Sequence, residues 1–79
     1  MGGVITFQQA QQDALQHLND IKNYNIAKGV PDENAKPWRR SGNQVFSVQT
    51  LINQVQMATP AGVSYIYELA TGQGNIIQR

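Results

Sequence analysis

Residues 61–69 read Ala-Gly-Val-Ser-Tyr-Ile-Tyr-Glu-Leu, and this stretch decides the fold because it is compatible with both a strand and a helix. Apolar and aromatic side chains recur at every second position, a period typical of a strand with one buried face. The residues on that face are Val63, Tyr65, Tyr67 and Leu69. Gly62 weakens a helix at the same place. We therefore predict a strand here and keep a helix as the alternative.

The helix alternative rests on the residues that frame this stretch. Thr59 is a favourable N-cap, Pro60 suits the first helical position, and Gly72 is a natural stop. One helical face would then carry Val63, Ile66, Tyr67 and Ala70. In that case the chain would be all-α, with three short helices.

The residues that follow favour the strand. Residues 71–74, Thr-Gly-Gln-Gly, have the composition of a turn, and residues 75–78 form a second apolar segment. Ile76 and Ile77 in that segment need a partner to bury against, which a C-terminal hairpin supplies.

A first helix is predicted upstream, beginning near Thr6. Thr6 is an N-cap residue, and Gln9 three positions later completes the capping-box pattern. An apolar stripe follows at three- and four-residue steps, made of Phe7, Ala10, Ala14, Leu18 and Ile21, with Leu15 beside it. We expect this helix to end between Asn23 and Gly29, where helix formers become scarce.

A second helix is predicted from Ser47 as N-cap, with Phe46 before it as a hydrophobic staple, to near Ala58. Its apolar stripe is Val48, Leu51, Ile52 and Val55. The sequence thus predicts a single α+β domain over residues 1–79, with two amphipathic helices packed on a short antiparallel sheet or C-terminal hairpin. The pairs Val4-Ile5 and Val45-Phe46 are candidates to extend that sheet.

The small size of the chain limits its stability. Seventy-nine residues bury only about 60% of the unfolded surface, and the chain has no cysteine and one histidine, so no disulfide or thiolate metal site can reinforce it. We therefore expect a homo-oligomer. The net charge of +1 argues against extended duplex nucleic acid and anionic membranes as partners. No run is long and apolar enough to be a membrane span or a signal peptide, so we expect a cytoplasmic protein.

The best candidate site lies in a predicted long loop at residues 30–43. This loop contains the only tryptophan and two of the three arginines, and four of the six basic residues fall within positions 28–40. The candidate ligand- or partner-binding residues are Lys28, Lys36, Trp38, Arg39 and Arg40. In one interpretation the indole stacks on a partner while a guanidinium binds a phosphate or carboxylate. In the other, Trp38 closes the core and the arginines neutralise Asp32 and Glu33.

Other candidates carry less weight. Tyr65 and Tyr67 would share one strand face, a spacing that can stack bases, although we favour core packing or an oligomer interface as their role. His17 lies between Asp13 and Asp20 on one helical face, an arrangement more typical of a solvated surface than of a metal site. We find no complete catalytic constellation, and expect no catalytic residue, metal or cofactor.

Two functions remain. The first is a non-enzymatic binding protein that acts by stoichiometric occupancy of an acidic protein surface, a phosphorylated small ligand or a short nucleic acid. Small inhibitors and accessory proteins of phages and mobile elements are often of this size, which is an analogy of size only. The alternative is a structural assembly protein that uses the Gln-rich face of the first helix and a sheet edge.

Overall fold

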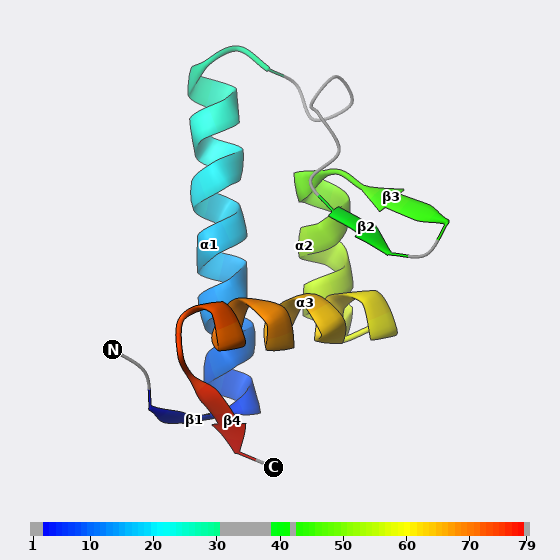
Figure 1. Ribbon diagram of the computed structural model, residues 1–79. Coiled ribbons are helices and arrows are strands. Elements are labelled where there is room, and N and C mark those ends of the chain that lie inside the picture. Colours follow the sequence, from blue (N-terminus) through cyan, green and yellow to red (C-terminus); the bar gives the residue numbers. More distant parts are fainter. Residues whose placement is uncertain (1–2, 31–38, 42, 79) are drawn as a thin grey trace.

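We describe a computed structural model of the chain, which covers residues 3–30, 39–41 and 43–78 (Figure 1). Its elements in order are β1 (Val4–Thr6), α1 (Phe7–Ala27), β2 (Arg39–Ser41), β3 (Gln44–Phe46), α2 (Val48–Met57), α3 (Pro60–Gly72) and β4 (Ile76–Gln78). The predicted α+β class is confirmed, with three helices and two short sheets in the described part of the chain.

Helix α1 confirms the predicted first helix. The Oγ1 atom of Thr6 accepts a hydrogen bond from the backbone N–H of Gln9 at 3.1 Å, which satisfies a donor that the helix itself leaves unpaired. Ala10, Ala14 and Leu18 of the predicted stripe are buried. The helix ends at Ala27, inside the interval predicted from composition.

Helix α2 confirms the second prediction. The side chain of Ser47 accepts from the backbone of Thr50, and the side chain of Thr50 accepts from the backbone of Ser47, which together form a capping box. The apolar stripe is buried, with Leu51 and Val55 fully enclosed. The helix stops at Ala58, which adopts the left-handed conformation with φ 53°.

The preferred strand over residues 61–69 is wrong, and the helix alternative is correct. Thr59 caps α3 through a hydrogen bond from Gly62 N–H to its Oγ1 at 3.3 Å, and Pro60 occupies the first turn. Gly62, which argued against a helix, is needed here: a Cβ on it would lie 2.2 Å from the carbonyl oxygen of Gln54 in α2. The close approach of the two backbones therefore outweighs the low helix propensity of glycine.

The two sheets also differ from the predicted hairpin. The predicted C-terminal strand exists as β4, but it pairs in parallel with β1, Val4 opposite Ile76 and Ile5 opposite Ile77. β2 and β3 form a separate antiparallel pair, which we call the ribbon. The end of the predicted loop at residues 30–43 is thus a strand over Arg39–Ser41, while residues 31–38 lie outside the described part.

The core lies among the three helices rather than between helices and a sheet. Strands of three residues offer too little surface to bury two helices, so α1, α2 and α3 pack on one another. Figure 1 shows α3 crossing the first half of α1, with β1 and β4 beside the start of α1. Ile5 and Ile77 pack against the helical core from this terminal sheet, and Phe46 from the ribbon is buried. Among the described residues, no helix has the length and apolarity to cross a membrane.

Candidate functional site

The ribbon positions the two arginines of the candidate site. Arg39 and Arg40 are consecutive in β2, and successive side chains of a strand point to opposite faces. The exposed surface follows this alternation, because Arg39 is largely covered and Arg40 is exposed. The two arginines therefore have different surroundings.

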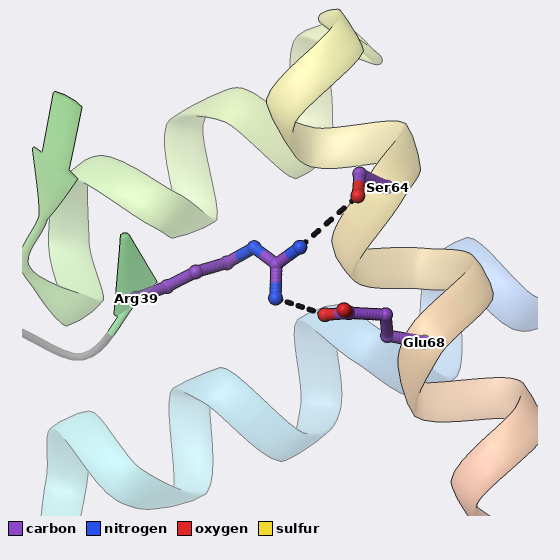
Figure 2. Close-up of polar contacts among 3 residues, drawn as sticks. All are labelled: Arg39, Ser64 and Glu68. Carbon is purple, nitrogen blue, oxygen red and sulfur yellow. Dashed lines mark hydrogen bonds and ion pairs between the residues drawn. The ribbon is translucent and has the colours of Figure 1, made fainter. Parts of the chain in front are cut away.

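Arg39 points toward α3 and joins the ribbon to it (Figure 2). Its Nη1 atom forms an ion pair with Glu68, and its Nη2 atom donates to the Oγ atom of Ser64 at 3.0 Å. The guanidinium carbon lies 5.6 Å from the centre of the Tyr65 ring, within the range of a cation–π interaction. The side chain of Arg39 is 17% exposed and that of Glu68 is 63% exposed.

This environment makes Arg39 part of the fold. Its Nε atom is buried and has no hydrogen-bond partner among the described residues. The acidic partner that we find for Arg39 is Glu68, whereas Asp32 and Glu33 lie outside the described residues.

Arg40 lies on the other face of the ribbon and is exposed. Its partner across the ribbon is Val45, which is 48% exposed. Side chains directly opposite in an antiparallel pair have Cβ atoms about 5 Å apart, so the guanidinium of Arg40 emerges beside an apolar side chain. Of the two ribbon arginines in the predicted site, Arg40 is the exposed one, and it lies opposite Val45, which the sequence analysis did not place in the site.

The structure does not bring Lys28 to the ribbon. Lys28 is the C-cap of α1, and its Nζ atom lies 5.6 Å from the centre of the Tyr24 ring in the same helix. In Figure 1 this end of α1 and the ribbon are well separated. Lys36 and Trp38 lie outside the described residues, so their predicted roles stay predictions.

The two tyrosines do not form a stacking platform, because they lie on a helix. Residues two apart in a helix point about 200° away from each other. Tyr65 is buried beneath Arg39, whereas the ring of Tyr67 faces Phe7 of α1 at a centroid distance of 6.2 Å. Tyr65 thus packs in the core, and Tyr67 contacts α1 from α3.

The acidic residues near His17 bind amide groups on their own helix. Gln9 Nε2 donates to Asp13 Oδ1 at 2.9 Å, and Gln16 Nε2 donates to Asp20 Oδ1 at the same distance. Across residues 3–30, 39–41 and 43–78, we find no cluster of three acidic, histidine or cysteine side chains that could hold a metal ion.

The sequence did not single out Ser64 or Glu68 as partners of Arg39. They are four residues apart, so they lie on one face of a helix, and the helix alternative for residues 61–69 contained that signal. The strand prediction also places Ser64 and Glu68 on one face, but it assigns that face to a hairpin instead of to a helix beside the ribbon. Comparison of the chain with known protein families, with curated proteins and with solved structures found no match to any of them.

Proposed function

We propose that this chain is a non-enzymatic binding protein that occupies an acidic protein surface through Arg40 and Val45 on the exposed face of the ribbon. The observation that carries the proposal is the difference in burial and contacts between two adjacent arginines. Arg39 is tied to α3 through Glu68 and Ser64, while Arg40 on the opposite face is exposed.

A ribbon held in this way favours binding. A side chain on a fixed strand loses less conformational freedom on association than one on a loose loop. The guanidinium of Arg40 can form two parallel hydrogen bonds to one carboxylate, and Val45 adds apolar contact beside it. A protein surface offers both a carboxylate and apolar area, which a free phosphate does not. Lys36 and Trp38 precede the ribbon in sequence, and the part that the sequence assigns them in binding stays a prediction.

The test uses the single tryptophan as a reporter, because Trp38 is adjacent to the ribbon in sequence. Fluorescence titrations compare a Glu-rich peptide, inorganic phosphate and a short single-stranded oligonucleotide. The variant is Arg40→Ala, and Lys22→Ala on α1 is the control that loses the same charge elsewhere.

We expect salt-dependent binding of the acidic peptide, weakened about tenfold or more in Arg40→Ala and unchanged in Lys22→Ala. Equal affinity of the wild type and Arg40→Ala for the peptide would show that the exposed face of the ribbon does not bind it. Binding of phosphate or the oligonucleotide, with no binding of the peptide, would assign the face to a different class of ligand.

A further inference from the structure

The second half of α1 carries an exposed aromatic face that the proposed function does not use. A hollow of about 420 Å³ lies along it, lined by His17, Asp20, Ile21, Tyr24 and Asn25. Tyr24 is 63% exposed, although tyrosine usually buries its ring. Figure 1 shows that α3 crosses only the first half of α1, so the second half extends beyond it. We call the lining residues together with Lys28 the Tyr24 face.

The charges on the Tyr24 face are arranged symmetrically about the aromatic ring. Asp20 lies four residues before Tyr24 and Lys28 four residues after it, so one opposite charge stands about one helical turn to each side. The Nζ atom of Lys28 lies 5.6 Å from the centre of the Tyr24 ring, which holds the cation over this face. A helix with an anion at one end and a cation at the other is complementary to an antiparallel copy of itself.

We propose that the Tyr24 face binds the same face of a second copy of this chain, with the two α1 helices antiparallel. In this arrangement Tyr24 of each copy lies opposite Ile21 of the other, so that each ring enters the partner's hollow. Lys28 then lies opposite His17 of the partner. Because Asp20 is three residues from His17, at 1.5 Å per residue, each ammonium comes within one helical turn of the partner's Asp20.

A second copy fits this face better than a charged partner. Asp20 and Lys28 cancel each other within one face, so a strongly acidic or basic surface would meet repulsion from one of them. A two-fold contact satisfies both charges twice and fills both hollows. The contact covers only about two helical turns, which is small for a protein interface, so the expected dissociation constant is on the order of 10⁻⁴ M.

The experiment measures self-association of the full chain by sedimentation equilibrium and by translational diffusion in NMR over a wide concentration range. Asp20→Lys and Lys28→Asp each place like charges across the proposed contact, and the double variant Asp20→Lys/Lys28→Asp restores opposite charges. Lys22→Asp is the matched control for Lys28→Asp. It makes the same charge change on the same helix, but Lys22 is two residues from Tyr24 and so lies on the opposite side of α1, where it lines a different hollow with Ile26 and Val48.

We expect dimerisation of the wild type, weakening of at least tenfold in each single charge variant and in Tyr24→Ser, and recovery to within about threefold in the double variant. Lys22→Asp should dimerise like the wild type. Far-UV circular dichroism verifies that each variant is folded, and Tyr24→Ser replaces an exposed ring that folding does not need.

Two results would overturn the proposal. A wild-type chain that remains monomeric at millimolar concentration has no self-complementary face of this kind. A dimer that persists in Asp20→Lys and Tyr24→Ser uses another surface, such as the terminal sheet, where Val4 and Ile76 are paired and each is 66% exposed.

Discussion

Gly62 of α3 lies directly against the carbonyl oxygen of Gln54 in α2. An added Cβ at position 62 would lie 2.2 Å from that oxygen and 2.7 Å from the backbone nitrogen of Val55. Both atoms belong to the backbone of a helix, so neither can move aside as a flexible side chain would. Thr59 strengthens the same junction, because its Oγ1 atom lies 2.6 Å from Oε1 of Gln54 and its backbone N–H donates to the Gln54 carbonyl at 3.1 Å.

We therefore expect Gly62→Ala to destabilise the fold by about 3 kcal/mol, because the methyl group forces α2 and α3 apart. Urea unfolding followed by circular dichroism measures the change. Gly72→Ala in the same helix is the control, since a Cβ there meets nothing within 4 Å. It should be neutral or stabilise by up to about 1 kcal/mol. Equal stability of the two variants would show that the helices can separate without loss.

The same junction explains why the sequence predicted α1 and α2 correctly and α3 incorrectly. The first two helices have local signals: Thr6 and Ser47 as N-caps, and apolar stripes at a helical period. Gly62, by contrast, disfavours a helix when the local sequence alone is considered. It is needed in α3 because the backbone of Gln54, in a different helix, lies against it. A residue whose role is to permit close approach looks like a helix breaker until its neighbour is known.

The remaining differences also arise from contacts between distant residues. Val4 pairs with Ile76 across almost the whole chain, and a local pattern of apolar residues does not reveal whether a strand pairs in parallel or through a hairpin. Within the candidate site, the sequence analysis named the two neighbouring arginines together, and their role in binding stays a prediction. It did not separate their roles, because that depends on which strand face meets α3.

The two arginines should differ in their effect on stability. We expect Arg39→Ala to lower the free energy of unfolding by about 2 kcal/mol, because it removes a hydrogen bond to Ser64, an ion pair with Glu68 and packing over Tyr65.

Arg40→Ala is the matched control, and its effect should stay within about 0.5 kcal/mol because that side chain is exposed. Chemical denaturation of both variants at low and high salt measures the difference. The ion pair itself should contribute less than about 1 kcal/mol, since Glu68 is mostly exposed and screened by solvent. A larger loss in Arg40→Ala than in Arg39→Ala would contradict the assignment of Arg39 to the fold.

Gln11 should stabilise the end of α2 from a distance. Its Nε2 atom donates to the carbonyl oxygen of Val55 at 2.8 Å, one of the last carbonyls of that helix, and approaches the carbonyl of Gln56 at 3.5 Å. Gln11→Ala should therefore lower the free energy of unfolding by about 1 kcal/mol. Gln12→Ala, one position away on the exposed side of α1, should change it by no more than about 0.5 kcal/mol. Thermal and urea unfolding of the pair provide the measurement, and indistinguishable curves would show that this hydrogen bond has no net effect.

Ala58 offers a substitution that should increase stability. It ends α2 in the left-handed conformation, with φ 53° and ψ 40°, which costs a residue with a Cβ about 1 kcal/mol relative to glycine. Its side chain is exposed, so removal of the methyl group sacrifices no core packing. Part of the gain is offset because glycine also has more freedom in the unfolded chain. We therefore expect Ala58→Gly to raise the free energy of unfolding by about 0.5 kcal/mol, measured by the shift of the urea midpoint at constant slope.

Ala27→Gly, at an exposed position in the last turn of α1, is the control, and it should have the opposite sign because that residue is helical. A loss of stability in Ala58→Gly as large as that in Ala27→Gly would mean that the left-handed turn between α2 and α3 is not maintained in solution.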